Sequence, residues 1–126
     1  MNYNEYKNRA KLFSSPAHHF CLSFYSLLLS RGIDEDDISK ENNTLNCRFG
    51  SISFIGKYVT YFNEEEVVES KCAAFVLYGG SKWEMFSLNN EKELFALVDL
   101  FIKGDIVNGS HSIYDENTQT FKRERV

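Results

Sequence analysis

His18, His19 and Cys21 are the residues whose types and spacing come closest to a chemical site. His18 and Cys21 would share one helical face, where an imidazole and a thiol could bind a metal or form a nucleophile–base pair. Zinc needs four ligands, however, and the remaining candidates stand singly: Cys47, Cys72 and His111. We therefore expect no metal, no cofactor and no catalytic pair. The histidines then lie near a helix start, where the dipole favours neutral imidazole.

A run of carboxylates, Asp34–Asp37, offers a second kind of chemistry. A calcium loop would need a glycine at its turn and a glutamate at its twelfth position, and the sequence has neither. No acid has an apolar neighbour that would raise its pKa for general acid catalysis. Gly79-Gly80 also lacks the rest of a phosphate-loop pattern. The sequence predicts a solvated acidic loop and a protein that is not an enzyme.

The distribution of charge is the feature that points to a partner. Residues 34–69 contain nine acids and three bases, a local balance of -6 within a chain whose net charge is -4. The two acidic clusters flank the expected first hairpin, so an antiparallel arrangement could bring both to one edge of the sheet. Such an edge would steer a basic protein toward it.

An apolar anchor would complete such a binding edge. Trp83, Tyr58 and Tyr61 are the aromatic residues that we expect to supply it. Aromatic residues in strands can also stack nucleic acid bases, but few basic residues accompany them and the chain is acidic, so nucleic acid is not the expected partner. The predicted partner-binding residues are Asp34, Glu35, Asp36, Asp37, Tyr58, Tyr61, Glu64, Glu65, Glu66, Glu69 and Trp83.

Three function classes remain open. The first is a small acidic protein that binds and inhibits a basic protein. Immunity proteins that neutralise bacterial nuclease toxins work in this way, an analogy carried by charge and size and not by any motif. The second is a small-molecule-binding or catalytic domain, with a pocket between helices and sheet and His18, His19 and Cys21 at its mouth. The third is a subunit that contributes only a structural interface.

Length and composition predict a single domain that can bury a hydrophobic core. The 126 residues are 43% hydrophobic and 15% aromatic, and an odd number of cysteines, three, indicates buried thiols. Residues 1–11 are too polar for a signal peptide, so the expected location is the cytoplasm, without membrane contact. Residues 1–104 form the expected domain, and residues 105–126 form a polar extension that can hold a short hairpin.

Helical patterns occupy both ends of this domain. The most apolar window, 15–32, begins with Ser15 and Pro16 and ends at Gly32, which are typical helix boundary residues, so we expect a central core helix. Residues 2–13 predict a short helix before it, and residues 91–103 predict a later one with an Asn90/Glu93 capping box.

The middle of the chain predicts strands, because residues 44–88 are rich in β-branched and aromatic residues. The expected strands cover 44–49, 52–54, 58–62, 72–78 and 82–88, with a bulge or tight turn at Gly50 and a two-residue hairpin at Gly56-Lys57. The predicted fold is therefore α+β: two N-terminal helices, an antiparallel four- or five-stranded meander, and a C-terminal helix on the same face of the sheet.

Overall fold

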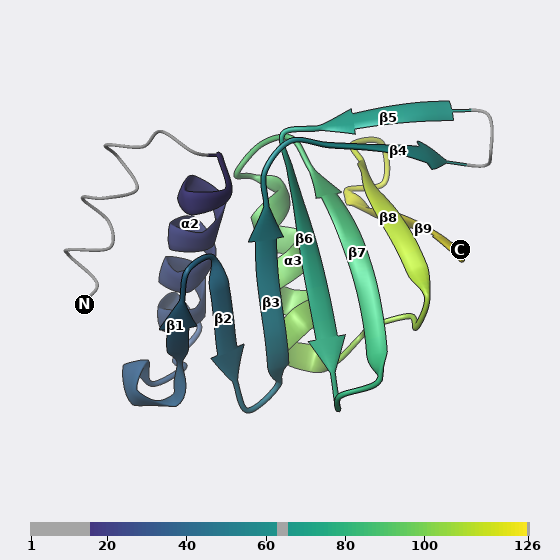
Figure 1. Cartoon of the computed structure of the whole chain (residues 1–126). Coiled ribbons are helices and arrows are strands. Elements are labelled where there is room, and N and C mark those ends of the chain that lie inside the picture. Colours follow the sequence, from purple (N-terminus) through teal and green to yellow (C-terminus); the bar gives the residue numbers. More distant parts are fainter. Residues whose placement is uncertain (1–15, 63–65, 126) are drawn as a thin grey trace.

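The fold consists of a large sheet with helices on one side and a separate hairpin at one end (Figure 1). The computed structural model describes the backbone of residues 16–62 and 66–125 and the side chains of residues 16–57 and 70–124. Its elements, in chain order, are α2 (Pro16–Ser30), a 3₁₀ turn η1 (Glu35–Asp37), β1 (Ser39–Glu41), β2 (Thr44–Cys47), β3 (Gly50–Ile55), β4 (Tyr58–Phe62), β5 (Glu66–Ser70), β6 (Cys72–Tyr78), β7 (Lys82–Leu88), α3 (Glu93–Lys103), β8 (Ser110–Asp115) and β9 (Thr120–Arg125).

The main sheet has seven strands in the order β1-β2-β3-β6-β7-β8-β9. The expected antiparallel meander of four or five strands is therefore wrong. β7 and β8 pair in parallel, whereas the other neighbours are antiparallel. A parallel pair needs a crossover connection, and α3 provides it. Within the expected polar extension, residues 105–126, β8 and β9 form an antiparallel hairpin, and this hairpin belongs to the main sheet.

The predicted hairpin at Gly56-Lys57 also differs from the structure. β3 pairs with β6, with Ser53 opposite Phe75, and not with β4. β4 and β5 instead pair only with each other, from Tyr58 opposite Ser70 to Phe62 opposite Glu66. Residues 56 and 57 thus form the bend at which the chain leaves the sheet, and the β4–β5 hairpin projects from that end (Figure 1).

The tight turn expected at Gly50 lies instead at residues 48 and 49, and Gly50 starts β3 opposite Cys47. A Cβ atom at Gly50 would lie 2.5 Å from the carbonyl oxygen of Leu77 on the neighbouring strand. Close approach between the two backbones therefore requires glycine here.

Both described helices end where the sequence indicates, and α3 begins at Glu93, two residues after its predicted start. α2 is followed by Gly32 in the left-handed conformation, with φ at 85°. Before α3, the Asn90 side chain accepts a hydrogen bond from the Glu93 N–H, and the Glu93 carboxylate accepts one from the Asn89 N–H. Gly104 closes α3 with φ at 71°. The expected helix over residues 2–13 and the Ser15 cap lie outside the described residues.

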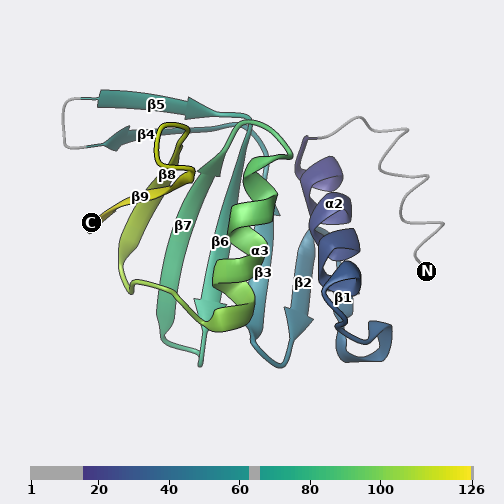
Figure 2. The ribbon, with the colours of Figure 1, turned by 180° about the vertical axis from the view of Figure 1, so that it is seen from behind.

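The core lies between these helices and the facing side of the sheet (Figure 2). The Phe24 ring of α2 lies 5.6 Å from that of Phe54 in β3 and 5.6 Å from that of Phe101 in α3. Phe101 also contacts Phe49 and Tyr78, so one aromatic cluster joins both helices to the sheet. Within the described part of the chain, no helix is long and apolar enough to cross a bilayer.

Candidate functional site

The face of the main sheet that points away from the helices carries a group of large apolar side chains. Ala74 and Val76 of β6 are buried in the core, so their neighbours Phe75 and Leu77 point to the opposite side. Trp83 lies opposite Leu77 in the register, which places it on the same side. We call this side the open face, and its central patch consists of Ile55, Phe75, Leu77, Trp83 and Met85.

The centre of this patch is a stacked aromatic pair. The rings of Phe75 and Trp83 are nearly parallel, with centroids 5.5 Å apart and an interplanar angle of 10°. Ile55 is 48% exposed and Leu77 is 36% exposed. A contiguous apolar patch with a rigid aromatic centre is the arrangement that partner-binding surfaces use as an anchor.

Of the predicted binding residues, only Trp83 belongs to this patch. The other four patch residues were missed, although a signal existed: both faces of residues 72–78 are apolar. That pattern was attributed to an interior strand, and β6 is indeed interior to the sheet. An interior strand can nevertheless expose one apolar face when the described helices cover only the other face of the sheet. Whether that apolar face is exposed therefore depends on the arrangement of strands and helices, and not on the local sequence pattern.

The backbone that the structure describes for the second predicted acidic segment, in β5, lies far from Asp34–Asp37 (Figure 1). Asp34 caps η1, with its Oδ1 accepting a hydrogen bond from the Asp36 N–H at 2.9 Å, and residues 34–37 are exposed beside the β1 margin of the sheet. The β4–β5 hairpin lies at the opposite end (Figure 1). Glu64 and Glu65 lie outside the described residues, as do the side chains of Tyr58, Tyr61, Glu66 and Glu69.

The predicted pocket mouth at His18, His19 and Cys21 would need all three side chains at the surface. Cys21 is only 1% exposed and belongs to the core, whereas His19 is exposed on the surface of α2. Burial and the nearby Cys21 raise the pKa of Cys72 to about 12, so its thiol stays protonated. Among the described residues, no group of three or more histidine, cysteine or acidic side chains could hold a metal ion.

A serine–histidine pair that sequence reasoning missed lies on the open face. Ser87 Oγ lies 2.8 Å from His111 Nε2, joining β7 to β8, and Glu124 of β9 lies opposite His111 in the register. These residue types resemble a catalytic triad, but Ser87 is 2% exposed and His111 is 3% exposed. Both side chains are buried, and their hydrogen bond joins two neighbouring strands of the sheet.

We expect the His111 imidazole to reduce stability in acid. Its burial lowers the pKa in the folded chain, an effect that Glu124 partly offsets. As pH falls below the ordinary value of about 6.5, the unfolded chain takes up the proton first, and stability is lost. Urea melts from pH 7.5 to 5 should show a loss in the wild type that His111→Gln reduces, by no more than about 1.4 kcal/mol per pH unit. Parallel pH profiles for the two proteins would contradict this expectation.

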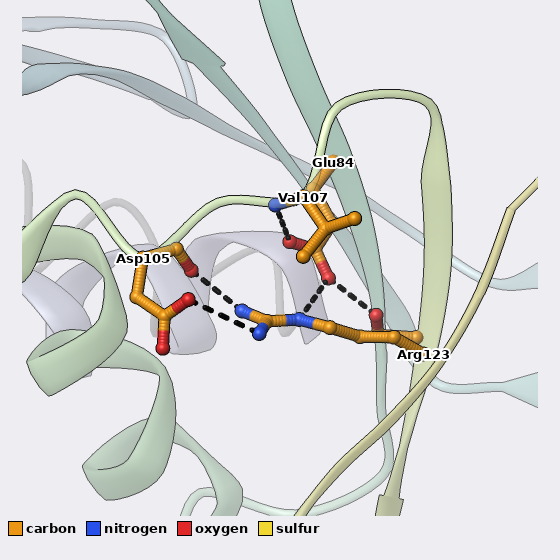
Figure 3. A network of polar contacts seen from close by, with 5 residues as sticks. Glu84, Asp105, Val107 and Arg123 are labelled. Atoms are coloured by element: carbon orange, nitrogen blue, oxygen red, sulfur yellow. Dashed lines mark hydrogen bonds and ion pairs between the residues drawn. The ribbon is translucent and has the colours of Figure 1, made fainter.

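On the helix side of the same strands lies a buried charge network (Figure 3). The Glu84 carboxylate has no solvent exposure and accepts hydrogen bonds from Arg123 Nε at 2.9 Å, the Val107 N–H at 2.9 Å and the Ser112 hydroxyl at 2.5 Å. Arg123 also donates to Asp105. With this many donors, the hydrogen-bonding capacity of the buried carboxylate is satisfied. The network therefore stabilises the packing of β7, β9 and the segment after α3 against one another.

The part of the molecule suited to binding is thus the open face, and the buried polar groups serve the fold. No protein-family model matches the chain, and comparison with curated proteins and with solved structures finds no significant match.

Proposed function

We propose that this chain is a non-enzymatic binding protein that docks a basic protein partner on its open face. The observation that carries the proposal is the stacked Phe75–Trp83 pair with exposed Ile55 and Leu77 around it. A rigid aromatic pair loses little conformational freedom on binding, so burying it contributes a large share of affinity.

Charge beside the patch supports a basic partner. Residues 33–56, which run from the end of α2 through β3, contain five acids and two bases. Asp34–Asp37 is exposed, and Glu41 lies on β1, the edge strand on that side. An acidic margin next to an apolar centre favours a partner whose apolar contact is surrounded by lysine and arginine.

An immunity-type protein that neutralises a bacterial nuclease toxin fits this description by class. Nucleases carry a basic surface because they bind phosphates, and an acidic protein that docks there blocks the substrate. The rival function, catalysis or small-molecule binding between helices and sheet, has less support, because the described space there is filled by the core, from Phe24 and Phe54 to Phe101.

The test is recovery of a partner from the native cell with matched variants as bait. Trp83→Ala removes the anchor, and Asp36→Lys with Asp37→Lys reverses the acidic margin. Phe95→Ala is the control, because Phe95 is 55% exposed on α3, on the helix side of the sheet. We expect the wild type and Phe95→Ala to recover one basic protein, and Trp83→Ala to bind it at least about 30-fold more weakly.

Two measurements on the purified pair complete the test. Trp83 is the single tryptophan of the chain, so burial by a partner should shift its fluorescence emission to shorter wavelength. The charge-reversed variant should associate about tenfold more slowly at low salt, a difference that about 0.5 M salt largely removes. Equal recovery of the partner by all four baits, or no change in Trp83 emission when the partner binds, would contradict the proposal.

A further inference from the structure

The Asn108–Gly109 turn, just before β8, holds the backbone of Trp83 in the open face. Asn108 Oδ1 accepts a hydrogen bond from the Trp83 N–H at 3.0 Å, and the Gly109 N–H donates one to the Trp83 carbonyl oxygen at 2.9 Å. A strand residue directs these two groups to the same side, and the ladder between β7 and β8 begins only one residue later, at Glu84 opposite Ser110. The turn therefore holds the main chain of Trp83 where β8 has not yet begun.

The residues on both sides of this turn are held in place against β7. Before the turn, the Val107 N–H donates to the buried Glu84 carboxylate at 2.9 Å. After it, Ser110 begins a ladder of four residue pairs with β7, and its N–H donates to the Val107 carbonyl oxygen at 3.2 Å. The main chain of the turn thus spans a fixed distance, and an atom added to it would displace the turn from Trp83.

The sequence of this turn is chemically reactive. Asn108–Gly109 is the one Asn-Gly pair in the chain, and Asn108 is exposed. Glycine has no Cβ atom to obstruct its nitrogen, so the Gly109 nitrogen can attack Asn108 Cγ, and the Nδ2 amide leaves as ammonia with the Gly109 proton. Water then opens the succinimide that results. Attack of water at Cγ gives aspartate, whereas attack at the main-chain carbonyl carbon gives isoaspartate, whose main chain runs through Cγ and is one atom longer.

We propose that Asn108 is a deamidation site whose isoaspartate product releases Trp83 and so weakens binding at the open face with time. The effect on binding rests on the proposed function, whereas the modification itself does not. The aspartate product keeps an oxygen that can accept from the Trp83 N–H and leaves the main chain unchanged. The longer isoaspartate product cannot keep both hydrogen bonds between fixed flanks. Because the Trp83 ring stacks on Phe75, a loosened Trp83 backbone disturbs the centre of the patch.

Mass spectrometry of the full chain, digested after storage at neutral pH, tests the modification site. The turn lies at the end of the β7–β8 ladder, where local opening costs least and frees both reacting groups. We expect Asn108 to react at least about tenfold faster than Asn117, which is also exposed in a turn but precedes the β-branched Thr118. A rate at Asn108 no higher than that at Asn117 would overturn the assignment.

Fluorescence of Trp83, the single tryptophan, tests the structural effect without any partner. The isoaspartate form, isolated by chromatography, is compared with freshly prepared Asn108→Asp. This variant is a matched control, because it carries the same added negative charge on a main chain of normal length. We expect acrylamide to quench Trp83 more strongly in the isoaspartate form, and Asn108→Asp to match the wild type. Equal quenching of the isoaspartate form and Asn108→Asp would overturn the role given to the turn.

Affinity for the basic partner tests the effect on binding. The isoaspartate form should bind about threefold to tenfold more weakly than Asn108→Asp, the effect of losing one hydrogen bond. An isoaspartyl methyltransferase with its methyl donor returns isoaspartate to aspartate through the succinimide, so this treatment should restore both the affinity and the quenching. Stronger quenching of Trp83 with unchanged affinity would contradict docking on the open face and leave the modification site standing, so the two proposals can fail separately.

Discussion

Arg123→Met is expected to lower the free energy of unfolding by about 3 kcal/mol, because it leaves the fully buried Glu84 carboxylate without its cation. Removing one member of a buried pair costs about 3–5 kcal/mol, and the lower end applies here because Val107 and Ser112 still donate to Glu84. Methionine retains much of the aliphatic part of the arginine side chain. The loss in free energy of unfolding therefore comes from the missing guanidinium charge and not from lost packing. Urea melts at pH 7 measure it.

Two further variants isolate the buried charge as the cause. Glu84→Gln in the Arg123→Met background removes the charge but keeps an oxygen that can accept from Val107, so the double variant should lose less stability than Arg123→Met alone. Lys92→Met breaks the exposed Lys92–Glu116 pair and should change the free energy by less than about 1 kcal/mol. If Arg123→Met and Lys92→Met lower the free energy of unfolding by the same amount, the buried network does not stabilise the fold more than an exposed ion pair does.

Phe101→Ala is expected to cost about 3–5 kcal/mol, the range for deleting a buried aromatic side chain. The Phe101 side chain is fully buried, and its ring meets those of Phe24, Phe49 and Tyr78 at centroid distances of 5.6, 6.2 and 5.8 Å. Its loss would therefore open a cavity between α2, α3 and the sheet. Chemical denaturation with an unchanged m-value is the measurement.

The same helix supplies the control for this prediction. Phe95→Ala on α3 should change stability by less than about 0.5 kcal/mol, because Phe95 is largely exposed. Phe24→Ala should cost about as much as Phe101→Ala, and the double variant less than the sum, because the two rings are in contact. A loss below about 1 kcal/mol for both single variants would show that the core lies elsewhere.

Local signals in the sequence were enough to place the described helices. Gly32 and Gly104 end them and Asn90 with Glu93 begins the second, because capping depends only on residues within a few positions. Strand segments such as 72–78 and 82–88 were also predicted, since β-branched and aromatic content is a local property.

Pairing between distant strands could not be predicted in the same way. A short hairpin was expected within residues 105–126, but the pairing of β8 with β7 in the main sheet was not predicted. The inward side of β8 is polar, because Ser110 and Ser112 face the buried Glu84, so the usual apolar alternation is absent. That polarity makes sense only once Arg123 of β9 is placed beside Glu84, 39 positions away. The candidate binding patch depends equally on strand order, which brings Phe75 and Trp83 together on the open face.

The crossover through α3 also fixes the order in which a growing chain can complete its structure. Glu84 leaves the ribosome well before Val107, Ser112 and Arg123, the groups that satisfy it in the finished fold. Until β9 has been synthesised, the Glu84 carboxylate keeps its water, because burying it without a cation is too costly. During translation we therefore expect β7 and the segment after α3 to pack together only after β9 has been synthesised, so that β9 governs when this domain becomes resistant to proteases.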